Sequence, residues 1–542
     1  MKLIVTFFCV INEKDKLKCN NNNILLVKVS HRGDNVDIIL NKIASIAQKE
    51  KVQLYMVGGC LRWLFLEKEK SEGREKGKEE EIFDIDLIVE GEAGPFAQKA
   101  ASELKGSLVI LDREEGVFRI AIKKEDLMPE TFSAGTLCID LTSLKGNSLN
   151  EDLAERDFTV NSFALDLREY LCSSLWREKA IDPFNGLNDL QEGIIRAVSP
   201  GIYFKDPLRL LRAARLCAHL NFTLEESTRK GIISQRSLIK DSSGERIRDE
   251  LWRIFEIDDS YRWIVLLEEE LGLLTELFPE INKMRSTEQN YYHGEDVWNH
   301  CMRTYQDLEG YIKCPPFTSK VTSKLKGQLG EEIIPGRNRK QLLKFFVLFH
   351  DAGKIKTKRM LDTGRIVFHG HEKEGISYID SYGDFLKLSA AEIKTAKTFM
   401  KMHMRPLQLN VAKNAGPKAF YRFFNKAGRD SVEVLLHSLA DFTAKRKASG
   451  HTEEIKPYED FIQEMYNKYY FKKESFVSPP KLVNGSDITK ALQIKPSPEV
   501  GYLLEKISEA QVEGKIKNRK EALMLASKMA QDKIFKKRSR QK

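Results

Sequence analysis

Two aspartates, Asp84 and Asp86, stand two residues apart in the segment FDIDLIV. Side chains at positions i and i+2 of a β-strand point to the same face, so a strand here would hold both carboxylates together. Carboxylate oxygens are the ligands that Mg²⁺ prefers. Such ions lower the pKa of an attacking hydroxyl and neutralise a triphosphate and the pyrophosphate that leaves it. The pair therefore predicts a magnesium site, whereas the alternative for an isolated D-x-D pair is a solvated surface.

A glycine pair upstream of the aspartates favours the first interpretation. Gly58 and Gly59 lie between an apolar strand-like run, VQLYMV, and a helix-like run, CLRWLFLE. Glycines at such a turn let backbone N–H groups and a helix N-terminus approach a phosphate. Arg62 follows one turn into the helix and could pair with a triphosphate oxygen. Asp140, in CIDLT, is a candidate third carboxylate from a neighbouring strand, although a turn-capping role explains it equally well.

The elements that must position these residues form a mixed sheet. Strand-like runs occur at VQLYMV, IFDIDLIVE, SLVILD, GVFRIAIK and LCIDLTSL, so residues 50–165 predict a sheet with one or two packed helices. A charged segment at 67–81 predicts a solvated loop or a helix extension. From about residue 185 the apolar spacing is helical, apart from a Pro/Gly-rich break at 478–488.

Two further polar groups lie on these elements. Arg156, Asp157 and Asn161 form a cluster in ERDFTVNSFALDL, for which a helix N-cap at Asp157 is an additional interpretation. Asp206 and Arg209 are spaced i, i+3 in DPLRLLRAARL and are expected on one helix face.

The second pair has the chemistry of a base reader. A carboxylate can accept from the exocyclic amine of cytosine or adenine while a guanidinium donates to the ring nitrogen; guanine and uracil present the opposite groups. An exposed helical salt bridge is the alternative. Arg212 and Arg215 continue the same ridge and are expected to face phosphate or RNA.

Together these blocks resemble the class II tRNA nucleotidyltransferase and bacterial poly(A) polymerase family. VGGCLR with DID resembles its metal and triphosphate block, ERDFTVNSFALDL its ribose block, DPFNGLNDLQEGIIRAV its linking segment and FKDPLRLLRAARL its base-reading block. The blocks occur in the family's order over about residues 52–255. The resemblance implies that Asp84 and Asp86 hold Mg²⁺ and that Asp206 and Arg209 select the base. This chain departs at Trp63, Glu155 and Lys205, where the family often has Asp, Arg and Glu.

Histidines and aspartates gather further along the chain. Six of the ten histidines fall in 293–403. The order of a His, a His-Asp pair and a distant Asp resembles an HD-family phosphohydrolase domain, which implies a divalent-metal site of unknown metal. The matching residues are His300, His350, Asp351 and Asp441, with His371 and His403 as possible additional ligands. Hydrolysis of phosphomonoesters or cyclic phosphates and a purely structural role are both open.

Bulk composition agrees with a nucleic-acid enzyme without specifying one. The 542 residues carry a formal net charge of +9, which suits a polyanionic partner, and 42% hydrophobic residues are enough for packed cores. Eight scattered cysteines without a CxxC pair favour a reducing cytoplasm. The apolar start MKLIVTFFCVI is too short to span a bilayer and lacks a signal-peptide cleavage site.

The sequence thus predicts an α+β chain: a polymerase-beta-like head with a mixed sheet, then helical neck, HD and tail regions. Expected boundaries are a leader at 1–30, head 31–170, neck 171–285, HD domain 286–455 and RNA-binding tail 456–542, whose segment 482–523 resembles the tRNA-gripping tail of bacterial CCA-adding enzymes. The expected reaction is transfer of CMP or AMP from CTP or ATP to the 3′ end of tRNA or another RNA. Addition of only CC or only A, poly(A) synthesis, and an HD phosphohydrolase with a nucleotide-binding head are the alternatives. The sequence does not indicate the oligomeric state.

Overall fold

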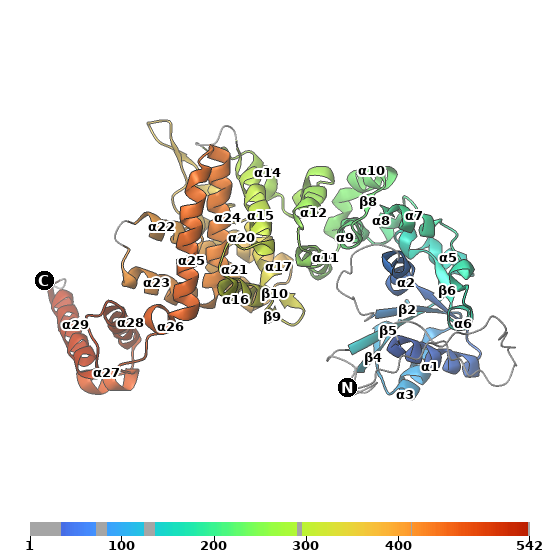
Figure 1. Ribbon diagram of the computed structural model, residues 1–542, viewed down its shortest axis with the longest axis horizontal. Helices are drawn as coiled ribbons and strands as arrows, with labels where there is room; N and C mark the ends of the chain where they lie inside the picture. The colour runs from blue at the N-terminus through green and yellow to red at the C-terminus, as the bar shows by residue number, and fades with distance from the viewer. Residues whose placement is uncertain (1–33, 72–83, 124–135, 290–294, 413–414, 540–542) are drawn as a thin grey trace, which may run out of the picture. The chain divides into compact units, whose positions relative to one another are not determined.

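The computed structural model describes residues 34–71, 84–123, 136–289, 295–412 and 415–539 (Figure 1). The predicted leader and residues 72–81 of the charged segment lie outside this range. Contacts divide the chain into two compact units, and the boundary along the chain lies between Ile202 and Tyr203. None of the described helices has the length and apolarity needed to cross a membrane.

The first unit is built on a six-stranded sheet with the order β3-β4-β5-β2-β1-β6. Only β2 and β5 run parallel to each other; the other neighbours are antiparallel. The strands are β1 (Leu54–Val57), β2 (Asp84–Val89), β3 (Ser107–Asp112), β4 (Val117–Lys123), β5 (Thr136–Ser143) and β6 (Ala164–Asp166). The mixed sheet predicted from the sequence is confirmed.

Alternation along the strands gives this sheet two different faces. Ile85, Leu87 and Val89 of β2 are buried, and α3 (Ala93–Leu104) packs on β4 and β5, with α1 (Asp34–Glu50) against it. Asp84 and Asp86 point to the opposite face because they alternate with these residues. The second face is polar at Asp84 and Asp86 but apolar further along the strand at Ile88, which is buried in a cluster with Val57, Leu153 and Ala164.

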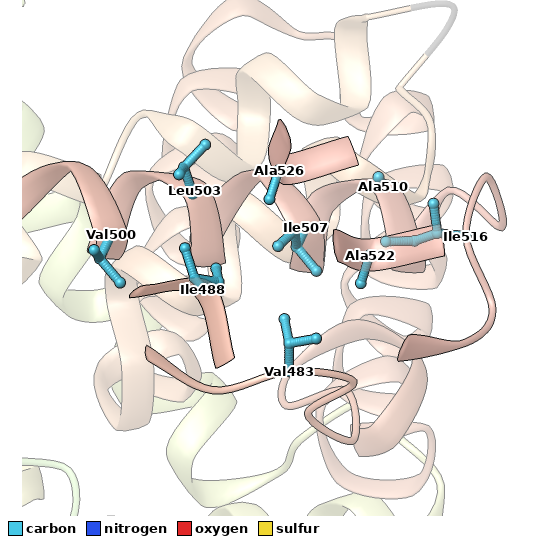
Figure 2. Close-up of a cluster of buried hydrophobic side chains, with 9 residues drawn as sticks. All are labelled: Val483, Ile488, Val500, Leu503, Ile507, Ala510, Ile516, Ala522 and Ala526. Carbon is cyan, nitrogen blue, oxygen red and sulfur yellow. The ribbon is translucent and has the colours of Figure 1, made fainter. Parts of the chain in front are cut away.

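The second unit is helical. Its central long helices are α15 (Val297–Lys313) and α24 (Ser431–Ser449), which pack on each other, and nearby lie α17 (Arg339–Val347) and α21 (Ala390–Met402). Upstream of them, α9 (Arg209–Leu220) packs on α11 (Gly244–Glu256). The last three helices, α27 (Gly485–Leu492), α28 (Pro498–Val512) and α29 (Arg519–Ser539), enclose their own apolar core (Figure 2).

Two local features differ from the sequence-based expectation. The predicted break at 478–488 ends early, because the Asn484 side chain and Asp487 form a capping box that starts α27 at Gly485. The strand β6 was not predicted; its three residues pair with β1 inside the segment expected to be a polar cluster followed by an apolar run.

Candidate functional site

The glycine turn and the aspartates meet at one point of the sheet. Val57, the last residue of β1, pairs with Asp86 of β2, so Gly58, which begins α2 (Gly58–Ser71), lies against the Asp86 carboxylate. Gly58 has φ +68°, and a Cβ built on it would lie 2.7 Å from Asp86 Oδ2. A side chain at residue 58 would therefore be strained in its backbone and collide with the carboxylate.

Asp140 lies beside these aspartates, as predicted from its strand. In the parallel pairing of β2 and β5 it is level with Asp86, and both of its carboxylate oxygens accept from Arg119 of β4, each at 2.7 Å. Such bidentate pairs fix the orientation of both side chains. The three carboxylates therefore share one face of the sheet, but Asp140 is already paired with the guanidinium of Arg119.

The charge balance of this face fits a bound cation. Burial, followed by the negative charges of Asp140 and, more weakly, Asp84, raises the pKa of Asp86, while Arg156 and the Gly59 backbone N–H oppose the rise. Excess negative charge on a partly buried carboxylate is what a divalent ion relieves. Asp84 and Asp86 are the residues on this face that could hold Mg²⁺.

The ribose-block residues join this turn through side-chain hydrogen bonds. Arg62 of α2 donates to the Asn161 side-chain oxygen, and the Asn161 amide donates to Asp157 Oδ1 at 3.0 Å. Asp157 also accepts from the Phe158 backbone N–H at 2.8 Å, and the 3₁₀ turn at Thr159–Asn161 has no side-chain cap. The N-cap interpretation of Asp157 is therefore wrong, because its carboxylate orients Asn161 instead. Arg156 pairs with the buried Asp152 at 3.3 Å.

In the second unit, the predicted base-reading pair lies at the start of α9. Arg209 is the first residue of that helix, whereas Asp206 belongs to the preceding turn. The backbone carbonyl of Asp206 accepts a hydrogen bond from the Arg209 N–H at 3.1 Å. Asp206 Oδ1 accepts from the Leu208 N–H at 3.3 Å. The two residues are neighbours, but they do not share the regular helix face expected from their spacing.

The other two arginines of the ridge are paired with acids of the protein. Arg212 lies 3.8 Å from Asp206 Oδ2 and 3.5 Å from Glu250 of α11. The Arg215 side chain is only 14% exposed and also pairs with Glu250. Contact with phosphate or RNA stays a prediction for both, and Arg215 would have to leave a buried ion pair to make it.

All six predicted ligands of the histidine region converge in one buried cluster. His300, His350, Asp351 and Asp441 bring their ligand atoms within 4.8 Å of one another, and Asp351, His371 and His403 form a second such group. The Nε2 atoms of His371 and His403 lie 3.1 Å apart, and Asp351 Oδ1 lies 3.3 Å from His371 Nε2. Asp351 therefore belongs to both groups, the arrangement expected of a carboxylate between two ions.

The protonation of five of the six predicted ligands, all except His350, suits metal binding. Burial lowers the pKa of His300 to about 4 and that of His403 to about 3, so both imidazoles are neutral at pH 7. Burial also acts to raise the pKa of Asp351 and Asp441, but Lys354 and Lys445, together with neighbouring histidines, more than offset it and hold the pKa of both carboxyls well below the ordinary range. Neutral imidazoles and ionised carboxylates are the forms that bind metal. His350 differs: burial acts to lower its pKa, but the neighbouring Cys301 and Asp351 raise it well above the ordinary value, so a metal ion there would have to displace its proton.

Orphaned nitrogen atoms in the cluster support the same conclusion. His350 Nδ1 faces the Val347 carbonyl at 2.8 Å, which directs its Nε2 into the cluster; there it makes no close hydrogen bond among the described residues and lies 3.4 Å from Asp351 Oδ2 and 3.7 Å from Asp441 Oδ1. Nε2 of buried His437, whose ring centroid lies 4.6 Å from that of His350, likewise has no hydrogen-bond partner within the described part of the chain. Buried polar atoms without partners commonly mark a ligand or ion.

Sequence reasoning missed three residues of these sites. His437 stands one helical turn before Asp441 on α24, a spacing that could have singled it out. Arg119 and Arg246 pair with Asp140 and Asp206, respectively, from distant segments, and no local pattern marks them.

Comparison with known proteins identifies the class of this chain. Residues 54–196 match the family described as the poly A polymerase head domain, residues 221–284 the probable RNA and SrmB-binding site of polymerase A, and residues 384–526 the putative tRNA nucleotidyltransferase domain 2. The head match covers the glycine turn, the aspartates and the ribose block. It defines the chain as a nucleotidyltransferase with a head that uses divalent metal.

Individual relatives narrow the class. The A-adding tRNA nucleotidyltransferase of Deinococcus radiodurans is 30% identical over 442 residues, which cover 80% of this chain and 89% of that protein. The CC-adding enzyme of Synechocystis sp. is 26% identical over 478 residues, 88% of this chain and 94% of that one. The chain therefore belongs to the class II tRNA nucleotidyltransferase and poly(A) polymerase family.

Solved structures agree on the fold. The structure of a CCA-adding enzyme in its apo form I matches with a TM-score of 0.58 at 20% sequence identity. The match covers 91% of this chain and 94% of the chain of that enzyme. A Thermotoga maritima CCA-adding enzyme complexed with tRNA has a TM-score of 0.56 at 19% identity, covering 92% and 96%.

Proposed function

We propose that this chain adds C, A or both to the 3′ end of tRNA, taking CMP and AMP from CTP and ATP and releasing pyrophosphate. The observation that carries the proposal is the pair Asp84 and Asp86 on one sheet face, with Gly58 fitted against Asp86 at φ +68°. The tRNA substrate is supported by the relatives named as A-adding and CC-adding enzymes and by the match of residues 384–526.

In this proposal the head residues bind and orient the nucleotide. Mg²⁺ held by Asp84 and Asp86 supplies charge neutralisation and activation of the attacking hydroxyl. The backbone at Gly58 and Gly59 and the guanidinium of Arg62 approach the triphosphate.

Arg156, Asp157 and Asn161 are assigned to the ribose and triphosphate, and Asp206 with Arg209 to the base. The hydrogen bonds from Arg62 to Asn161 and from Asn161 to Asp157 support a shared nucleotide-binding role for that cluster, because they fix its side chains relative to the glycine turn. Asp140 is assigned as a supporting carboxylate.

The nucleotides added are decided by extension of three tRNA transcripts, which end before CCA, after C and after CC. Each receives Mg²⁺ with CTP, ATP or both, and products are resolved at single-nucleotide length. We expect addition that stops at or before CCA. Addition of CC only or A only defines a partial enzyme, and unlimited runs of A on unstructured RNA would contradict the tRNA proposal in favour of a poly(A) polymerase.

A second function is supported by the His/Asp cluster. We propose that it holds two divalent ions that share Asp351, and that this HD-type centre acts on phosphate esters at RNA 3′ ends. The convergence of six buried His and Asp ligand atoms in two groups, with the buried His437 Nε2 beside them, supports bound metal over a purely structural packing role.

The metal proposal is tested by thermal unfolding with Mn²⁺, Co²⁺ or Ni²⁺ added to metal-stripped protein. An ion at 100 times its dissociation constant stabilises the folded state by about 2.7 kcal/mol. Asp351→Ala should abolish the stabilisation because both groups lose a ligand, whereas exposed His451→Ala should retain it. Equal metal-induced shifts in wild type and Asp351→Ala would contradict the proposal, and release of phosphate from 3′-phosphorylated RNA tests the activity separately.

A further inference from the structure

The predicted base-reading aspartate is held by an arginine from another helix. Arg246, in the first turn of α11, donates from Nη2 to Asp206 Oδ2 at 2.9 Å. The Asp206 side chain is 21% exposed and that of Arg246 is 52% exposed, so the pair lies at the surface of the second unit, within reach of a ligand. Neither the sequence motif nor the i, i+3 spacing of Asp206 and Arg209 includes Arg246.

The rest of α11 fixes this contact in place. Glu250, one turn after Arg246 on the same helix, is buried and pairs with Arg212 and Arg215 of α9. Arg212 in turn lies 3.8 Å from the Asp206 oxygen that Arg246 contacts. Two helices are therefore joined by an alternating row of charges, and Asp206 is its outermost acid.

This contact makes the two oxygens of Asp206 unequal. Oδ2 faces the guanidinium groups of Arg246 and Arg212, whereas Oδ1 accepts from the Leu208 N–H at 3.3 Å. A carboxylate oxygen has two lone pairs, so Oδ1 can accept one further donor. The carboxylate cannot rotate to offer both oxygens without leaving Arg246.

The inequality has a consequence for base selection. Cytosine and adenine each offer one amine beside a ring nitrogen that accepts, which suits a single carboxylate oxygen next to the Arg209 guanidinium. Guanine offers two adjacent donors, N1–H and the 2-amine, which suit a carboxylate with both oxygens free. A site that leaves a donor of the wrong base without an acceptor rejects that base strongly.

We propose that Arg246 is a specificity-determining positioning residue, which excludes guanine by keeping Asp206 Oδ2 occupied. The inference rests on the proposed role of Asp206 in reading the incoming base. Because the ion pair is half-exposed, it contributes little to stability, so its loss should alter selection more than folding.

The test compares kcat/KM for CTP and GTP in single-nucleotide addition to tRNA transcripts. In Arg246→Ala the preference for CTP over GTP should fall by about tenfold or more, the scale of one well-placed polar contact, chiefly through faster GTP addition. Arg246→Lys retains a cation at this position and should restore most of the preference. A merely structural role would lower both rates together and leave their ratio unchanged.

The control variant is Arg248→Ala on the same helix. Arg248 donates to the backbone carbonyls of Leu386 and Lys387 and anchors α11 without touching Asp206. Its loss should leave the CTP/GTP ratio unchanged; an equal loss of selectivity would mean that loosening of α11, not the Arg246 contact, is responsible.

A further variant separates this inference from the proposed function. If Asp206→Ala alters selection but Arg246→Ala does not, Arg246 has no part in it and the inference is overturned. If Asp206→Ala leaves selection unchanged, the base-reading assignment itself fails.

Discussion

Substitution of Gly58 by alanine tests whether the glycine turn positions Asp86. The backbone at residue 58 has φ +68°, and left-handed backbone costs an L-residue about 1–2 kcal/mol. The added Cβ would lie 2.7 Å from Asp86 Oδ2, closer than real Cβ atoms approach a neighbour, so the carboxylate must move. Misplacement of a catalytic group by about 1 Å costs about 100-fold in rate.

We therefore expect Gly58→Ala to fold with a melting temperature lower by about 2–8 °C, from about 2–4 °C per kcal/mol for a unit of this size. Its rate of nucleotide addition should fall by about 100-fold, with kcat affected more than KM for the primer. Single-turnover addition of one nucleotide to a tRNA transcript, at saturating Mg²⁺, measures this rate directly.

Gly116→Ala supplies a matched control. Gly116 also has positive φ, at +64°, and a Cβ there would lie 2.6 Å from Ser143 Oγ, so the backbone and contact costs are comparable. This variant should lose similar stability but keep nearly wild-type transfer. If the two variants showed equal transfer rates, the reasoning that ties Gly58 to Asp86 would be refuted.

Two further predictions concern pH. Burial and neighbouring charges raise the pKa of Asp86, and its ionised form binds metal, so nucleotide transfer should fail as the pH drops through a midpoint above the ordinary carboxyl range. Arg119→Ala should move that midpoint higher still, because it leaves the negative charge of Asp140 uncompensated. Profiles of kcat/KM against pH measure both midpoints. Metal-free protein should lose unfolding free energy as the pH falls from 7.5 to 5.5, since His219, His300 and His403, with folded pKa values of about 4, about 4 and about 3, take up protons in this window only after unfolding. His350, whose pKa is raised in the folded protein, opposes part of this loss. Denaturant titrations measure this loss, and an unfolding free energy that is constant over the window would contradict it.

The parts of the fold that sequence could predict are those with strong local patterns. The strand at Asp84–Val89 follows from the short apolar run around the aspartates, and the following helix from the run CLRWLFLE after the glycine pair, although that helix begins at Gly58 rather than after the glycines. The strand β6 could not be predicted in the same way, since its three residues are too short for a periodicity and depend on pairing with β1. Local pattern predicts elements better than it predicts their partners.

The same division holds for the site. The two aspartates and the six His/Asp residues could be singled out because their residue types and order carry the expected chemistry, and the structure brings the six together. The partners of the site residues could not be singled out, because Arg119, Arg246 and Glu250 act from segments brought together only by folding. The exact placement of Asp206 on a turn before α9 also escaped the spacing argument, since i, i+3 neighbours occur in turns as well as in helices.

The central claim is that Asp84 and Asp86 support nucleotide addition to tRNA. Its most direct test is extension of a tRNA transcript lacking CCA by wild type, Asp84→Ala and Asp86→Ala, with CTP, ATP and Mg²⁺, after thermal unfolding has shown that all three proteins are folded. We predict that wild type adds at most three nucleotides, by defined steps. The rate of addition by either variant should be lower than that of wild type by more than about 100-fold. Normal extension by either folded variant, or none by wild type on any of the three transcript ends, would contradict the account.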